Sequence, residues 1–234
     1  MVPDVSRVRQ GTVPGGAPRV AVGVSYNRGR DQWHAALVYG TELLPPRCLH
    51  LASDRDLRDV NLDDEDLGWP LRYAWVELRL PGETARAIAQ LCRQAARRVR
   101  SRGQEVRYGI RHHLGRFDAE TGAYLPAAGE RGLTCATCVL ALCRGAQVEL
   151  VDIAAWPARE EDGPWIKRVV DSLRRSDPTH AAAVESDGLC ARFRPTEVAA
   201  AGLADRLPID FPTAVRLSDA LRERYDALFP VTDL

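Results

Sequence analysis

Apolar and polar positions alternate along the first third of the chain, which is the pattern of half-buried β-strands. The alternation predicts four strands, over residues 20–26, 32–39, 47–52 and 71–80. The connections at 27–30 and 40–46 are short, so we expect the first three strands to pair antiparallel. Residues 1–17 read as a flexible tail, and the acidic segment 54–66 has no period and is predicted to be a loop.

After residue 82, the apolar residues follow the spacing of an α-helix instead of alternating. Residues 84–99 place their apolar side chains on one face and their arginines on the other, which predicts an amphipathic helix. Further helices are predicted over 165–175, 179–185 and 213–228, and short strands over 105–110 and 148–152. We therefore expect an α+β protein with a flexible tail at 1–18, a core at 19–155 and a helical C-terminal extension at 156–234.

The segment from Thr134 to Gly145 predicts a helix that is apolar on all sides and therefore central. Thr134 is a good N-cap and Gly145 a good stop. Cys135 then lies in the first turn, where unpaired N–H groups and the helix dipole lower a thiol pKa and can hold an oxyanion. This position makes Cys135 a candidate nucleophile; the alternative is a small buried apolar residue.

A catalytic thiol needs a base within hydrogen-bond reach, and that base needs a third group to orient it. His34 lies in the second predicted strand and His50 in the third. If Ala36 pairs opposite His50, the two histidines become diagonal neighbours on one face, with Cβ atoms ~7 Å apart. A shift of one residue would place them on opposite faces.

This order of parts resembles the permuted branch of the papain-like thiol hydrolases, in which the histidine strand precedes the cysteine helix. The branch includes the lecithin–retinol acyltransferase-like enzymes and permuted relatives of the NlpC-like cell-wall peptidases. The matching stretches are Trp33-His34-Ala35-Ala36-Leu37-Val38 and Thr134-Cys135-Ala136-Thr137-Cys138-Val139. The resemblance implies a permuted papain-like fold, an antiparallel sheet packed on a central buried helix, followed here by the helical extension.

The resemblance also implies a chemistry. Cys135 would attack an amide, ester or thioester carbonyl, His34 would move the proton, and His50 would orient His34. A thioacyl intermediate would pass to water in a hydrolase or to another nucleophile in an acyltransferase. Cys138 is the alternative thiol, disfavoured because it lies one turn deeper, and Asp54 and Asn61 are alternative orienting residues.

Two other functions compete with catalysis. A catalytically inactive papain-like protein could act as an interaction or adaptor module, with a protein partner on the C-terminal helices. A zinc site could use Cys135 and Cys138 with His112 or His113, although these two histidines read more simply as exposed loop residues. Trp156 and Trp165 fit either a substrate groove or partner surface, or an anchor between extension and core.

The composition of the chain limits the classes of partner that we expect. The chain has 32 basic and 32 acidic residues among 234, so no nucleic-acid partner is expected, and the arginines at 93–102 read as a solvated helix face. No stretch reaches the ~20 apolar residues of a membrane span. The N-terminus lacks the apolar block of a signal peptide, which favours a cytoplasmic protein with six reduced cysteines. We expect a peptide, amide or acyl substrate and neither cofactor nor metal.

Overall fold

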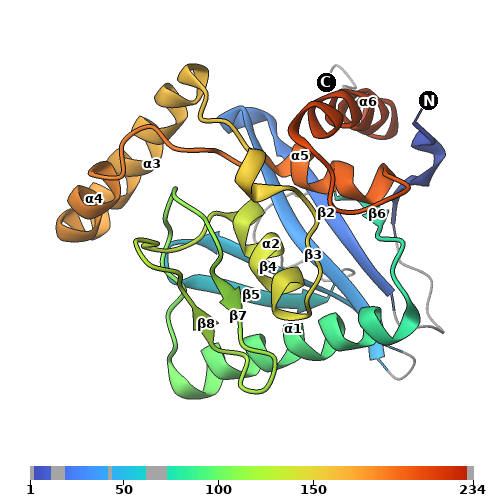
Figure 1. Cartoon of the computed structure of the whole chain (residues 1–234), viewed down its shortest axis with the longest axis horizontal. Coiled ribbons are helices and arrows are strands. Elements are labelled where there is room, and N and C mark those ends of the chain that lie inside the picture. The colour runs from blue at the N-terminus through green and yellow to red at the C-terminus, as the bar shows by residue number, and fades with distance from the viewer. Residues whose placement is uncertain (1–2, 12–18, 42–43, 62–72, 231–234) are drawn as a thin grey trace.

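The structure is a computed structural model that describes residues 3–11, 19–41, 44–61 and 73–230. The protein is α+β, as predicted, and is built on a six-stranded sheet in which each neighbouring pair is antiparallel (Figure 1). In spatial order, the strands are β1 (Val8–Gln10), β6 (Ala74–Glu77), β2 (Arg19–Asn27), β3 (Gln32–Thr41), β4 (Leu44–Ser53) and β5 (Asp56–Asn61).

The pairing of β3 with β4 has the register that the two histidines require. Leu37 lies opposite Leu49 and Val38 opposite Cys48, and the same register brings Ala36 opposite His50. Leu37 and Leu49 belong to the main core, whereas Ala36 and Cys48 belong to a separate small cluster. Because side chains alternate along a strand, His34 and His50 share the face of Ala36 and Cys48.

Helix α2 (Cys135–Gly145) runs through the centre of the molecule, as its uniform apolar character predicts. Residues 135–143 are all buried, and the helix packs on β3, β4 and α1 (Gly82–Arg102). Its N-terminus carries a capping box in which the Thr137 N–H donates to Thr134 Oγ1 at 3.1 Å and the Thr134 N–H donates to Thr137 Oγ1 at 2.7 Å.

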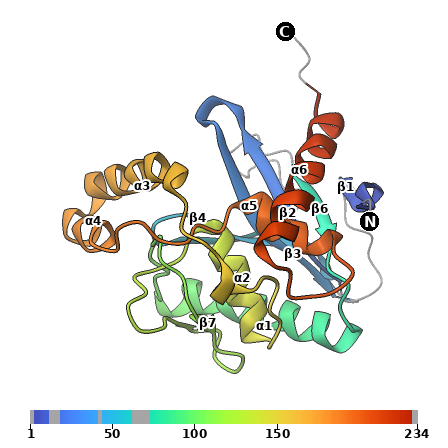
Figure 2. The same ribbon diagram turned by 45° about the horizontal axis from the view of Figure 1, so that its top comes forward.

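The C-terminal part of the chain contributes to two different hydrophobic clusters. The short helix α5 (Pro195–Ala199), which the sequence did not predict, packs on β2 and β3, and α6 (Phe211–Leu228) packs on α5 and β1. Both supply residues to the main core. Helices α3 (Gly163–Ser176) and α4 (Pro178–Glu185) form a separate hydrophobic cluster and project to one side (Figures 1 and 2).

Several predicted segments differ from the structure. Residues 56–61 form the edge strand β5 instead of a loop, because an edge strand can pair on one side while its charged side chains face solvent. The predicted tail contains β1, which pairs with β6. The strands predicted over 105–110 and 148–152 are reduced to single bridges, Tyr108 to Leu133 and Val151 to Ile209. Residues 62–66 and 71–72 lie outside the described residues.

Between α1 and α2, the chain forms a two-strand antiparallel hairpin of β7 (Arg116–Phe117) and β8 (Tyr124–Leu125). In the described part of the chain, no helix has both the length and the apolar composition that crossing a bilayer requires.

The capping box gives a stability prediction. Thr134→Ala removes the hydroxyl that accepts the Thr137 N–H at a buried helix start, so the free energy of unfolding is expected to fall by about 1–2 kcal/mol. Urea denaturation measures this change. Ser101→Ala, which removes an exposed hydroxyl on α1, is the control and is expected to change stability by less than about 0.5 kcal/mol. Equal effects of the two variants would contradict the assigned role of the cap.

Candidate functional site

Two imidazole rings meet at the point where β3 and β4 lie side by side. His34 Nε2 lies 2.9 Å from His50 Nδ1, a hydrogen-bond distance, and the rings are nearly perpendicular with centroids 5.0 Å apart. Tyr73 approaches His34 from the same face of the sheet, with ring centroids 6.5 Å apart. The structure therefore brings together His34 and His50.

Burial keeps both rings neutral. Burial, together with a smaller contribution from the neighbouring His50, lowers the pKa of His34 to about 3. Burial also lowers the pKa of His50 to about 4, with a contribution from Arg58 in the same direction and an opposing one from Asp56. Two neutral imidazoles can share one hydrogen bond only if one ring donates and the other accepts. His50 Nε2 is buried and has no hydrogen-bond partner among the described residues.

Cys135 begins α2 and is almost fully buried, with 5% of its surface exposed. A backbone hydrogen bond from Ala35 reaches its sulfur. Ala35 directly follows His34, so the sulfur lies beside the backbone from which the His34 ring projects. The described residues show no direct hydrogen bond between Cys135 and His34.

A split in the sheet explains how a residue of α2 reaches this amide. The described β3–β4 pairs end at Leu37 and Leu49, whereas β2 continues to pair with β3 as far as Gln32. The Ala35 amide therefore lies where β4 has separated from β3. Helix α2 packs on the face of Leu37, whereas the His34 side chain lies on the opposite face with Ala36, so the sulfur contacts the backbone next to His34 and not its ring.

The sequence-based expectation of a lowered thiol pKa is wrong for this conformation. Burial raises the pKa of Cys135, while backbone hydrogen bonds from Ala35 and Ala136 and the charge of Arg192 oppose that rise. Burial also raises the pKa of Cys138, and the neighbouring Cys135 and Cys143 raise it further. Among these thiols, Cys135 has groups around it that stabilise an anion.

Sequence reasoning missed two residues beside the thiol. Burial raises the pKa of the Tyr108 phenol, nearby Cys135 raises it further, and a backbone hydrogen bond from Cys135 opposes this rise. Arg192 lies over the ring of Trp165, 3.9 Å from its centroid, and donates to the buried Asp162 at 2.9 Å. Neither residue belongs to a local motif, because contacts between segments far apart in the chain bring both to Cys135.

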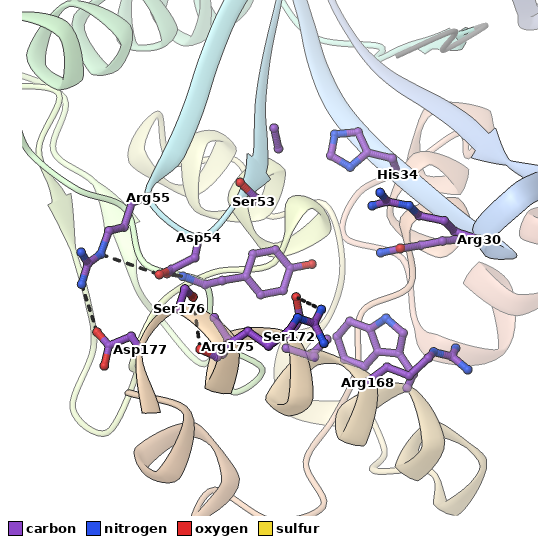
Figure 3. Close-up of a pocket in the computed structure, with 16 residues that line it drawn as sticks. Arg30, His34, Ser53, Asp54, Arg55, Arg168, Ser172, Arg175, Ser176 and Asp177 are labelled. Carbon is purple, nitrogen blue, oxygen red and sulfur yellow. Dashed lines mark hydrogen bonds and ion pairs between the residues drawn. The ribbon is translucent and has the colours of Figure 1, made fainter. Parts of the chain in front are cut away.

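A cleft of about 750 Å³ opens beside the histidine pair (Figure 3). His34, Ser53 and Tyr108 line it on the side of the sheet, and Trp165 and other residues of α3 line the opposite side. The cleft thus touches both the proposed base and the phenol beside Cys135. Its position between core and extension is suitable for a substrate.

Tryptophan residues in the extension have different environments. Trp165 lines the cleft, which agrees with the groove interpretation. Trp156 stacks on Phe193, with ring centroids 5.1 Å apart, and its indole N–H donates to the Arg192 carbonyl, so it anchors the extension to the core.

The two alternative orienting residues have other partners. Asp54 accepts the Tyr108 backbone N–H at 2.7 Å and a hydrogen bond from Arg107 at 3.1 Å, so it fixes the segment that carries the phenol. Asn61, at the end of the edge strand β5, accepts a hydrogen bond from Arg47 of β4. His50 is the residue in contact with the His34 ring.

The adjacent histidines upstream of α2, His112 and His113, also have different environments. The expectation that both are exposed is wrong for His112, which is buried, lies 3.2 Å from Glu130 and packs on Phe193. His113 is exposed, as predicted. The described ranges contain no group of three or more His, Cys, Asp or Glu side chains with the arrangement of a metal site.

Comparison of the chain with models of known families, with curated proteins and with solved structures finds no match. What the site can do therefore follows from its own geometry.

The neutral histidine pair predicts a pH dependence of stability. Both pKa values are about 3 to 4 in the folded protein, below the ordinary value near 6.5, so the unfolded chain binds more protons as the pH falls below about 6.5. The free energy of unfolding is expected to fall by roughly 1 kcal/mol per pH unit for each histidine between about pH 6 and 4.5.

Urea denaturation at several pH values measures this slope. His50→Leu is expected to flatten it, whereas His113→Gln, which changes an exposed histidine, is expected to leave it unchanged. A slope that is identical in wild type and His50→Leu would show that His50 is not held neutral by the fold.

Proposed function

We propose that this protein is a cysteine-dependent hydrolase or acyltransferase with a permuted papain-like fold, acting on an amide, ester or thioester carbonyl. The observation that supports this proposal best is the 2.9 Å contact between His34 and His50. It lies next to the strand position where the Cys135 sulfur accepts a hydrogen bond from the Ala35 backbone N–H. In this proposal Cys135 is the nucleophile, His34 is the base and His50 is the orienting group.

The hydrogen bond to His50 assigns the roles of the ring nitrogens. If His34 Nε2–H donates to His50 Nδ1, the neutral His34 ring has its acceptor at Nδ1, which is free to take the thiol proton. His50 then carries its own proton on Nε2. The pair therefore sets the tautomer of the base, as a third catalytic group does in thiol and serine hydrolases.

The neutral state of both partners determines the order of events. Because the pKa of Cys135 is raised and that of His34 is lowered, the thiol and the imidazole are neutral before substrate binds. We infer that the proton moves from sulfur to His34 as the sulfur attacks the carbonyl carbon. When the tetrahedral intermediate collapses, the leaving group takes that proton from His34 and a thioester remains on Cys135. Water or another nucleophile then gives a proton to His34 as it attacks the thioester, and the departing sulfur takes that proton back from His34.

The start of α2 provides a position for the oxyanion. The Cys135 backbone N–H lies at the positive end of the helix dipole, and the Tyr108 phenol interacts with it. Once substrate displaces the contact between them, the N–H and the phenol O–H are two donors for the developing negative charge.

Acylation by p-nitrophenyl acetate tests the nucleophile. An acetyl adduct, trapped by acid quenching and located by peptide mass mapping, is expected on Cys135, and Cys135→Ala is expected to abolish it. His34→Ala is expected to slow acylation by about 100-fold or more, because it removes the base. The matched control Cys138→Ala is expected to retain the adduct. Adduct formation on Cys138, or equal rates in wild type and His34→Ala, would contradict the proposal.

Replacement of Tyr108 by Phe tests the oxyanion position. Loss of one donor to the oxyanion is expected to lower the acylation rate by about 100-fold, while the fold is retained. Stopped-flow release of p-nitrophenol measures the rate, and thermal unfolding confirms folding. An unchanged rate in folded Tyr108→Phe would remove the phenol from the mechanism.

A further inference from the structure

On the side formed by α3, the cleft beside the histidine pair carries two arginines, Arg168 and Arg175, that form no ion pair with the described residues. We infer that the substrate bears an anionic group, a carboxylate or a phosphate, and that Arg168 and Arg175 on α3 bind it. This inference rests on the proposed function, because it concerns the substrate of that reaction. The binding of the anion itself does not depend on catalysis.

The wall formed by α3 presents one helix face to the cleft. Trp165, Arg168, Ser172 and Arg175 follow one another at spacings of three and four residues, which places them on the same side of the helix. Figure 3 shows Arg168, Ser172 and Arg175 on this wall, across the opening from His34 and Ser53. An anion held on α3 would therefore extend toward the histidine pair.

The acids that line the cleft are already neutralised. Asp54 accepts from Arg107 at 3.1 Å and lies 3.7 Å from Arg55. Asp177 accepts from Arg107 at 3.0 Å and from Arg55 at 3.1 Å. These two acids and two arginines form one closed cluster at one end of the cleft, with Glu105 also paired to Arg55. None of these acids forms an ion pair with Arg168 or Arg175.

A comparison between the two sides of α3 supports the same conclusion. On its outer side, Lys167 pairs with Asp171 at 2.7 Å, and Arg174 pairs with Asp171 at 2.9 Å and with Glu185 at 2.8 Å. On the cleft side, Arg175 donates to the Ser172 hydroxyl at 3.3 Å and attracts Asp171 without forming an ion pair, and Arg168 has no hydrogen bond or ion pair within the described residues.

This asymmetry is local, because the whole chain has a net charge of zero. Arg168 and Arg175 lie about two helical turns apart, and each guanidinium has the fixed donor geometry by which arginine binds carboxylates and phosphates. The ring of Trp165 adds an apolar surface beside them for the uncharged part of a ligand. An acyl compound with a negative group at a distance from its carbonyl fits these features.

Equilibrium binding tests the anion site without any catalytic step. Glutarate and inorganic phosphate are titrated into the full chain, with glutaramide as the neutral analogue of glutarate, and the chemical shifts of arginine and tryptophan side-chain N–H groups report binding. Glutarate or phosphate is expected to bind and glutaramide is not, with affinity falling as salt rises. Tighter glutarate binding identifies a carboxylate as the recognised group, and tighter phosphate binding identifies a phosphate.

Variants locate the site. Arg168→Gln and Arg175→Gln are each expected to weaken anion binding about fivefold, which is the upper range for an exposed ion pair. Arg174→Gln, on the outer side of the same helix, is expected to leave it unchanged. Anion binding that is absent, that equals glutaramide binding, or that is equally weakened by Arg174→Gln would overturn the inference, even if Cys135 is acylated.

The rate at which charged and uncharged esters acylate Cys135 tests whether the anion site acts in the proposed reaction. The p-nitrophenyl ester of N-succinylglycine is expected to acylate Cys135 faster than that of N-butyrylglycine, which has a similar length but no charge. Arg168→Gln with Arg175→Gln is expected to remove this preference without slowing the neutral ester. Acylation without charge preference would overturn the inference alone, whereas failure of both esters, with anion binding intact, would overturn the proposed function alone.

Discussion

The pairing register between β3 and β4 is the constraint on which the site depends. Leu37 opposite Leu49 buries both leucines under α2, and the same register places His34 and His50 as diagonal neighbours on the other face. A shift of one residue would turn the leucines out of the core and separate the imidazoles, so core packing and site geometry are fixed by one choice. The pairs end at Leu37 and Leu49, and this early end exposes the Ala35 amide to the sulfur.

Burial governs the electrostatics more strongly than the helix dipole does. At the start of α2, the dipole and the backbone N–H groups favour a thiolate, yet desolvation outweighs them and the pKa of Cys135 is raised. The same desolvation lowers the pKa of His34 and His50, which leaves a neutral base. A neutral thiol and a neutral imidazole together avoid the cost of an unpaired charge in this desolvated region.

The C-terminal part of the chain is integral to the proposed site. Asp162 binds Arg192 at 2.9 Å and Arg159 at 3.0 Å, and Arg159 in turn binds Glu197 of α5 at 2.6 Å. This buried network holds Arg192 against Trp165 and close to Cys135. Helix α3 then supplies the far wall of the cleft. The extension thus provides both charge beside the thiol and surface for a ligand.

The sequence by itself determined the elements whose periodicity is strong. The strands around His34 and His50, the arginine-faced helix α1 and the buried helix α2 with its Thr134 cap were all predicted, because alternation, helical spacing and capping are local properties. Tertiary structure alone decided the register that pairs the histidines, the contacts of Tyr108 and Arg192 with Cys135, and the strand β5. These features depend on contacts between distant segments and on desolvation, which no short stretch of sequence encodes.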